Sequence, residues 1–181
     1  METVSEVVAC YRFVDASLKS VNGGTQWVVG EWQKQEGELS LCGNGLHACQ
    51  EPYDSLSNIY GSKWFRAEAR GEMLHSDDKF CASEMRLVEE IPVRVIHQWA
   101  VDCAYRVLHL YEEKYPDDKR PREALEAAQA WIDDPTEENR EKLAAARAAA
   151  RDAARDAGRV AAWDAEEKWQ RQHLNELIEE S

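Results

Sequence analysis

Thiol and imidazole side chains lie close together between positions 42 and 49, in the order Cys42, His47 and Cys49. Thiolate sulfur and imidazole nitrogen are ligands that zinc prefers, and Cys81 could supply a fourth. Structural zinc sites usually show tighter paired spacing, and this chain contains no C-x-x-C pair. Its five cysteines therefore favour reduced, mostly buried thiols, and we predict no bound metal.

Carboxylates occur in adjacent pairs at eight places, and the formal net charge is −13. Such a field repels phosphate, so we expect no direct binding of nucleic acid. An acidic surface can instead dock on a basic surface, including the nucleic-acid groove of another protein. The candidate partner-binding pairs are Asp77 with Asp78, Glu89 with Glu90, Glu112 with Glu113, and Asp133 with Asp134.

Alanine and arginine dominate positions 144–162, where eleven of the nineteen residues are alanine. Alanine has the highest helix propensity, so this segment is predicted to be helical. Arginines spaced four apart share one helical face, and nearby aspartates make a solvated, self-paired face the default interpretation. Arg147 and Arg151 have no acidic residue three positions before them, so they remain candidates for binding an anion or an acidic partner. The four arginines of this stripe are Arg147, Arg151, Arg155 and Arg159.

The composition is that of an acidic globular protein. Hydrophobic residues make up 44% and charged residues 31% of the 181 positions, which is enough for one good core or two small ones. No apolar run approaches the roughly 18 residues that a bilayer requires, and the N-terminus lacks the features of a signal peptide. We therefore expect a cytoplasmic protein without a membrane segment. No complete catalytic signature is present, and we predict no cofactor.

Short β-rich segments separated by turn residues predict a small α+β unit in the first half. Residues 6–14 are typical of a central strand, and a Gly-rich turn at 22–24 precedes a predicted hairpin of 25–32 with 38–42. Residues 43–45 break the chain again, and Pro52 begins a predicted short helix. Two further strands, 63–70 and 79–89, complete a small mixed or antiparallel sheet.

From Arg94 the hydrophobic period changes from two residues to 3.6, which predicts a three-helix C-terminal region. The first helix ends before Pro116 and the second begins at Pro121. The third has Thr136 as its N-cap, is long and Ala-rich, and is expected to bend at Gly158.

These patterns predict an α+β domain at residues 1–92 and an α-helical domain at residues 93–181. No Gly/Ser/Pro-rich linker separates them. The apolar face of the first helix is too large to leave in water, so the domains are predicted to pack together. The residues expected at that contact are Ile96, Trp99, Cys103 and Val107.

The first half resembles an uncharacterised domain family found mostly in phage and prophage proteins. The resemblance rests on four motifs in order between Tyr11 and Ile91, namely TQWVVGEW, LCGNGLHAC, WFRAEARGE and DKFCASEMRLVEEI. It implies a protein of phage type and no particular activity.

The same segment is more distantly similar to the ADP-ribosyltransferase fold. The similarity lies in a strand with Tyr11 and Arg12, a Gly-rich turn before His47, a short helix with Tyr53, and the strand WFRAEARG. It implies that Arg12 holds NAD, His47 lines the nicotinamide pocket, and Glu84 stabilises the developing ribosyl cation. On the residues alone, the alternative is that His47 is a hydrogen-bonded turn histidine and Glu84 pairs across the sheet with Arg66.

The second half resembles a helical domain of bacterial immunity proteins, from Trp99 to the Ala-rich helix. The most specific segment is YPDD at 115–118, followed by RPR at 120–122. Immunity proteins bind and block a toxin, so the resemblance implies a protein-binding function and supplies no catalytic residues.

These observations favour a phage or prophage accessory protein that binds and inhibits a partner protein. The most specific hypothesis is an anti-CRISPR-like inhibitor whose carboxylates occupy a basic nucleic-acid groove of a bacterial defence complex. Two alternatives remain open: an NAD-dependent ADP-ribosyltransferase-like enzyme, and a structural or accessory phage protein without an inhibitory role.

Overall fold

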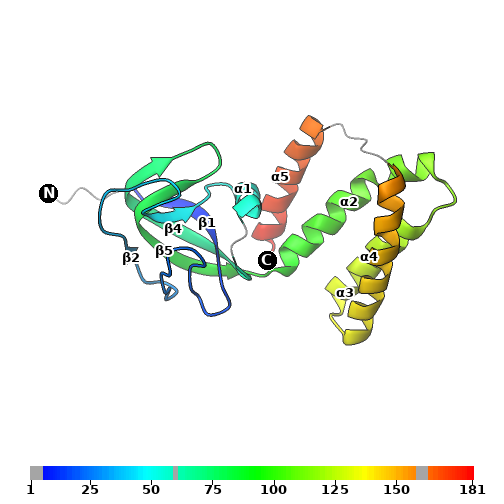
Figure 1. Ribbon diagram of the computed structural model, residues 1–181, viewed down its shortest axis with the longest axis horizontal. Helices are drawn as coiled ribbons and strands as arrows, with labels where there is room; N and C mark the ends of the chain where they lie inside the picture. The colour runs from blue at the N-terminus through cyan, green and yellow to red at the C-terminus, as the bar shows by residue number, and fades with distance from the viewer. Residues whose placement is uncertain (1–5, 59–60, 158–162) are drawn as a thin grey trace. The chain divides into compact units, whose positions relative to one another are not determined.

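The computed structural model describes residues 6–58, 61–157 and 163–181, and it describes no side chains between 148 and 165. The chain divides into two compact units (Figure 1). The sheet unit comprises Met1–Val93 and Ile178–Ser181, and the helical unit comprises Arg94–Leu177. The predicted α+β class is confirmed, with an antiparallel sheet in the first half and most of the helical residues in the second.

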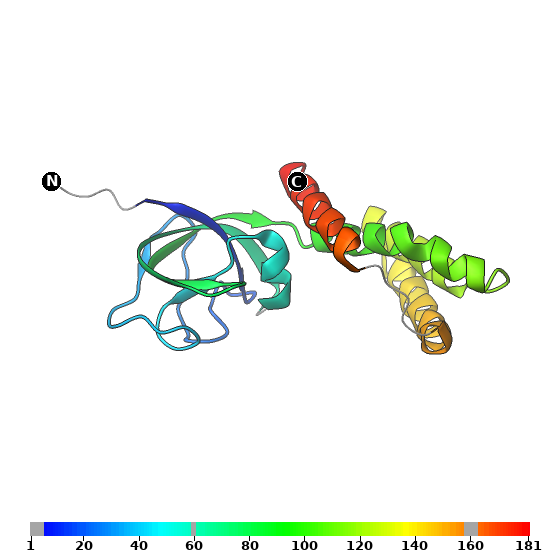
Figure 2. The same ribbon diagram turned by 90° about the horizontal axis from the view of Figure 1, so that it is seen from above.

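The sheet unit is built around a long hairpin of β4 (Lys63–His75) and β5 (Phe80–Ile91). β1 (Val8–Val14) pairs with β4, whereas β2 (Gln33–Lys34) and β3 (Leu46–Ala48) pair with β5. All pairs are antiparallel, and the strand order is β1-β4-β5-β2. The two long strands curve strongly (Figure 2). Two register shifts between them, at positions 66–67 and 70–73, are consistent with this curvature, because bulges bend a strand.

The core of the sheet unit contains large side chains from the strands and from the loop that follows β1. Trp27, Phe65 and Phe80 are each no more than 1% exposed, and Met85 and Leu87 are completely buried. Burying a side chain of this size contributes roughly 1.5–3 kcal/mol. This core holds the loop 15–32 against the sheet, although the loop forms no strand of its own before β2.

The predicted hairpin of residues 25–32 and 38–42 is wrong. Residues 28–31 form a turn instead, in which the Glu31 amide donates to the Val28 carbonyl over 3.1 Å. A strand would place Trp27 and Val29 on the same face. Trp27 is buried, however, whereas Val28 and Val29 are both exposed. The segment is therefore a loop anchored by one large side chain.

The short helix predicted at Pro52 is present as α1 (Pro52–Ser55), followed by the 3-10 turn η1 (Leu56–Asn58). Pro52 occupies the first turn, where a missing amide costs nothing. The Ser55 hydroxyl donates to the Pro52 carbonyl and accepts from the Trp64 indole, over 2.6 and 3.1 Å. These bonds fix α1 beside the start of β4. Ile59 and Tyr60, which the sequence pattern would place on the apolar side of this helix, lie outside the described residues.

The helical unit contains α2 (Arg94–Lys114), α3 (Arg120–Asp133), α4 (Glu137–Ala157) and most of α5 (Trp163–Glu179). As predicted, α2 ends before Pro116, α3 has Pro121 in its first turn, and the Thr136 side chain accepts from an amide of α4. The predicted third helix is found as α4 and α5, and the expected bend at Gly158 lies outside the described residues. No helix in the described part of the chain is long and apolar enough to span a bilayer.

Helix packing in this unit follows the predicted apolar faces of α3 and α4. On α2 the prediction is wrong, because the buried residues are Val95, Val101 and Leu108, whereas the predicted Val107 is 39% exposed. Val101, Ala128 and Leu143 form a buried cluster that joins α2, α3 and α4. α5 is held to α2 by polar contacts, since the Trp99 indole donates to the Gln170 carbonyl over 2.9 Å. His173 also lies 2.6 Å from the carboxylate of Asp102.

Residues 178–181 belong to the sheet unit, although a whole helical unit separates them from its strands in the sequence. Ile178 is 1% exposed. Its carbonyl accepts a hydrogen bond from Arg66 on β4 over 2.9 Å, and the Glu179 carboxylate lies 3.3 Å from the same guanidinium. The sheet unit is therefore discontinuous in sequence.

Candidate functional site

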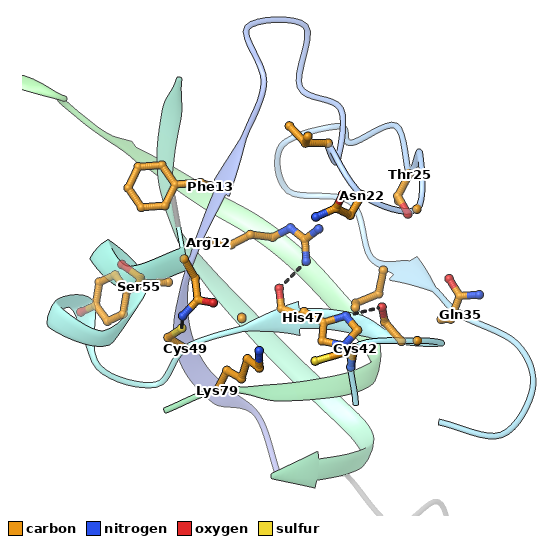
Figure 3. Close-up of a pocket in the computed structure, with 18 of the residues that line it drawn as sticks. Arg12, Phe13, Asn22, Thr25, Gln35, Cys42, His47, Cys49, Ser55 and Lys79 are labelled. Atoms are coloured by element: carbon orange, nitrogen blue, oxygen red, sulfur yellow. Dashed lines mark hydrogen bonds between the residues drawn. The ribbon is translucent and has the colours of Figure 1, made fainter. Parts of the chain in front are cut away.

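A pocket of about 450 Å³ opens in the sheet unit between β1, β3 and the loops beside them (Figure 3). Arg12 contributes from β1, His47 from β3, and Lys79 from the turn before β5. Asn22 and Thr25 line it from the loop that follows β1. The structure therefore brings together Arg12 and His47, two of the three residues that the ADP-ribosyltransferase resemblance selected.

One wall of the pocket is a turn stabilised by the side chain of Asn44. Its amide nitrogen donates to the carbonyls of Glu36 and Glu38 over 2.9 and 3.1 Å, and its oxygen accepts from Gln35 over 2.7 Å. The Ser40 amide donates to the Asn44 carbonyl over 2.8 Å. This turn replaces the strand that was predicted at residues 38–42, because its backbone groups bond locally.

Arg12 joins three parts of the pocket. One guanidinium nitrogen donates to the His47 carbonyl, and the other donates to the Ser20 hydroxyl over 2.7 Å. The guanidinium carbon lies 4.8 Å above the centre of the Trp27 ring, whose indole also donates to Ser20 over 2.8 Å. Burial lowers the pKa of Arg12 to about 10, with a smaller opposing effect of Cys10. The side chain remains charged at neutral pH.

His47 is a turn histidine with both ring nitrogens engaged. Nδ1 lies 3.0 Å from the Gly45 carbonyl, and Nε2 accepts from the Cys42 amide over 3.0 Å. This pair of partners requires the neutral tautomer with its proton on Nδ1. Burial lowers the pKa of His47, and the charges of Arg12 and Lys79 lower it further. The structure thus matches the hydrogen-bonded alternative for this residue.

Glu84 does not line this pocket. It lies on β5, 2.7 Å from Arg70 and 2.8 Å from Lys34. Hydrogen bonds from Lys34 and Arg70 lower the pKa of Glu84 and keep it ionised. Its predicted pairing with Arg66 is wrong, because the register places Arg66 opposite Glu89. No Asp or Glu occurs among the described residues of the pocket wall, so the carboxylate that ADP-ribosyl transfer requires is not brought there.

The cysteines form no metal cluster. Within residues 6–58, 61–157 and 163–181, no three His, Cys, Asp or Glu side chains are arranged to hold a metal ion. Cys42 is exposed, whereas Cys10, Cys49 and Cys81 are buried. Burial raises the pKa of Cys10 to about 12 and that of Cys49 to about 11, so both are thiols at neutral pH.

The four candidate acidic pairs lie at the ends of elements. Asp77 and Asp78 are in the exposed turn between β4 and β5, and Glu89 and Glu90 are near the end of β5. Glu90 pairs with Lys63 over 3.0 Å. In the helical unit the two candidate pairs are at the ends of different helices. Glu112 and Glu113 lie near the end of α2, and Asp133 and Asp134 are the last residue and the C-cap of α3.

Ion pairing distinguishes the two candidate acidic pairs of the helical unit. Glu112 accepts two hydrogen bonds from Arg122, over 2.7 and 2.8 Å, and is therefore neutralised. Asp133 and Asp134 are exposed, and no ion pair joins either to a residue in the described part of the chain. Arg147 is exposed on α4, and the side chain of Arg151 lies outside the described ones.

Sequence reasoning missed three features of the pocket. It assigned no role to Lys79, to Asn44 or to the Ser20 hydroxyl that joins Arg12 and Trp27. Asn44 did carry a signal, because an asparagine between two glycines is typical of a turn whose side chain bonds the backbone. Ser20 and Lys79 carried none, because tertiary contacts alone bring them to the pocket.

Comparison with known families supports the two-part description of the chain. Residues 86–166 match the family described as "Imm-5 like putative immunity protein". No curated protein and no solved structure matched the chain. Residues 8–98, which include the whole sheet and the pocket, match the family described as "Domain of unknown function (DUF7666)". The two resemblances predicted for the halves are thereby confirmed, and the chain belongs to the DUF7666 family.

Proposed function

We propose that this protein binds a partner protein and inhibits it, in the manner of an immunity protein. The observation that carries the proposal is the match of residues 86–166 to an immunity-protein family, which covers α2, α3 and α4. The helices of this unit are fastened to one another by a shared core and by polar contacts. Such a rigid scaffold suits a binding function, because little conformational entropy is lost on association.

The surface that we assign to the partner is the end of the helical unit that carries Asp133 and Asp134. Both carboxylates are exposed at the α3–α4 turn. The Asp133 carboxylate accepts from Gln129 over 2.9 Å, which holds it against α3. An anchored carboxylate without an ion pair keeps its charge available to an external cation.

We further propose that the partner presents a basic groove, as nucleic-acid-handling proteins do. The net charge of −13 makes the chain complementary to such a groove. A phage or prophage inhibitor acting in the host cytoplasm on a CRISPR-type defence complex is the most specific form of this hypothesis. The enzymatic alternative has less support, because no described carboxylate lines the Arg12 pocket.

The test is a plasmid-interference assay in bacteria that carry an active CRISPR effector. Expression of the protein should restore plasmid uptake if the effector is the partner. Asp133→Lys with Asp134→Lys should abolish the effect, since charge reversal turns attraction into repulsion. The matched control, Glu31→Lys with Glu36→Lys, changes the net charge equally at two exposed residues of the sheet unit and should retain most of the activity.

Two results would contradict parts of the proposal. Full inhibitory activity of the Asp133/Asp134 variant would show that this surface does not bind the partner. If the protein does not inhibit CRISPR effectors, the anti-defence hypothesis is wrong. Co-expression with toxins encoded beside the gene would then test whether the protein acts as an immunity protein. In either system the association rate should fall steeply with salt while the dissociation rate changes less.

A further inference from the structure

Three arginines of the sheet unit lie over tryptophan rings, and their electrostatic environments differ. Arg70 and Arg86 lie 4.0 and 4.9 Å from the centre of the Trp32 ring. Each is also paired with a carboxylate, Arg70 with Glu84 over 2.7 Å and Arg86 with Glu68 over 2.6 Å. These two arginines are neutralised by the protein itself.

Arg12 lies over Trp27 at a similar distance, 4.8 Å, but has no such partner. No ion pair joins it to any carboxylate in the described part of the chain, and its guanidinium donates to the neutral oxygens of His47 and Ser20. Its Nε atom is buried and has no hydrogen-bond acceptor among the described residues. Arg12 is partly buried. A cation withdrawn from water without a counter-charge is costly, so folded proteins normally supply one.

The surrounding pocket extends this positive region. Lys79 is a second cation on its wall, and no Asp or Glu is found among the described wall residues. Both cations lower the pKa of His47, which indicates that their fields overlap at the pocket wall. The amides of Asn22, Gln35 and Asn44 add neutral polar groups. In Figure 3 the Arg12 guanidinium projects into the space between Asn22 and His47.

We propose that this pocket binds a small molecule that carries an oxyanion, a phosphate or a carboxylate group, with Arg12 as its anchor. A guanidinium presents several donors in one plane and suits both groups. The volume of about 450 Å³ falls within the range of small-molecule sites. His47 serves as a wall and as an acceptor for the turn, because both of its ring nitrogens are engaged.

The site is tested by nuclear magnetic resonance of the arginine Nε–H groups in the full chain. Inorganic phosphate and acetate are titrated separately at constant ionic strength, and Arg12→Lys identifies the Arg12 signal by its loss. Phosphate or acetate should shift that signal saturably in the millimolar range, while the signals of Arg70 and Arg86 stay unchanged. Saturation by phosphate alone identifies a phosphate ligand, and saturation by acetate alone identifies a carboxylate ligand.

Arg12→Lys could also disturb folding, because Arg12 makes hydrogen bonds in the folded protein. A second variant therefore tests the site without changing Arg12. Asn22 is exposed at the pocket and is not part of the buried core, so Asn22→Asp adds a fixed negative charge there. It should weaken anion binding at least tenfold. The control Arg86→Lys should leave binding unchanged. Shifts that rise linearly without saturation, or equal affinity in Asn22→Asp, would overturn the proposal.

Discussion

Burial and the hydrogen bond from the Cys42 amide, rather than a catalytic partner, keep His47 neutral. The neutral ring is required because Nε2 accepts from the Cys42 amide. The pKa of His47 in the folded protein lies below its ordinary value of 6.5. The unfolded chain therefore binds the proton more readily, and the free energy of unfolding decreases as the pH falls through 6.5.

This linkage predicts the behaviour of His47→Gln. Glutamine can still accept from the amide of Cys42 but does not titrate, so the variant should lose less stability than the wild type between neutral and acidic pH. Urea unfolding at a series of pH values measures the difference. His75→Gln, at an exposed histidine, is the matched control and should follow the wild type. If His47→Gln loses as much stability at acidic pH as the wild type, protonation of His47 does not destabilise the folded protein.

At the scale of elements, the connection between α1 and β4 depends on one glycine. Gly61 has a φ of 137°, and a Cβ atom there would lie 2.1 Å from the carbonyl oxygen of Val14. Backbone atoms cannot give way as a flexible side chain can, so Gly61→Ala should separate β1 from the start of β4. We expect a loss of about 3 kcal/mol or more in the free energy of unfolding.

Gly23 provides the comparison for this prediction. Its φ of 82° also favours glycine, but a Cβ atom would meet nothing within 4 Å. Gly23→Ala should therefore cost only the backbone strain, about 1 kcal/mol. Chemical denaturation of both variants separates the two contributions. Equal losses would mean that the clash at Gly61 is relieved by movement of the chain.

Regular hydrophobic periods made the long elements predictable, while tertiary contacts set the parts that were missed. The periods located β1, β4, β5, α2 and α3 to within a few residues, apart from the extension of β4 to His75. The loop 25–32 has the composition of a strand, but burial of Trp27 alone determines its path. No local pattern encodes such a docking contact.

The candidate site shows the same division. The antiparallel bridge between Tyr11 and Cys49 brings Arg12 beside His47, and no local pattern predicts that bridge. Glu84 does not lie at the site to which the ADP-ribosyltransferase resemblance assigned it. Its position next to the buried Met85 indicates which face of β5 it occupies. Alternate residues of a strand face opposite sides, so Glu84 faces away from the core and meets Arg70.

At the scale of the whole molecule, the acidic charge predicts how the chain behaves toward nucleic acids. It should not retain duplex DNA or RNA in a gel-shift assay at physiological salt, because its field repels phosphate. If the protein does retain nucleic acid and the double variant Arg147→Glu with Arg151→Glu does not, the arginine stripe is the nucleic-acid-binding surface. The basic-groove hypothesis would then be abandoned.

The discontinuous sheet unit predicts that residues 1–92 are insufficient on their own. This fragment lacks Ile178, which is buried, and leaves Arg66 without its contacts to Ile178 and Glu179. It should be poorly soluble or unstable, and a soluble fragment with a cooperative unfolding transition would contradict this.

In the full chain, Ile178→Ala should lower the free energy of unfolding by about 2–4 kcal/mol, as measured by urea denaturation, whereas Glu180→Ala should leave it unchanged. Packing of the two halves through Ile96, Trp99, Cys103 and Val107 stays a separate prediction.

The position of Ile178 also has a consequence for synthesis on the ribosome. Domains usually fold as units while the chain emerges, beginning with the N-terminal one. Here the strands of the sheet unit leave the exit tunnel first, yet their buried partner follows only after the entire helical unit has been translated. During that interval the helical unit can fold, while the nascent sheet unit lacks Ile178. The apolar surface that Ile178 will cover is then exposed to chaperones. We therefore expect the helical unit to reach its native state first, in the reverse of the order of synthesis.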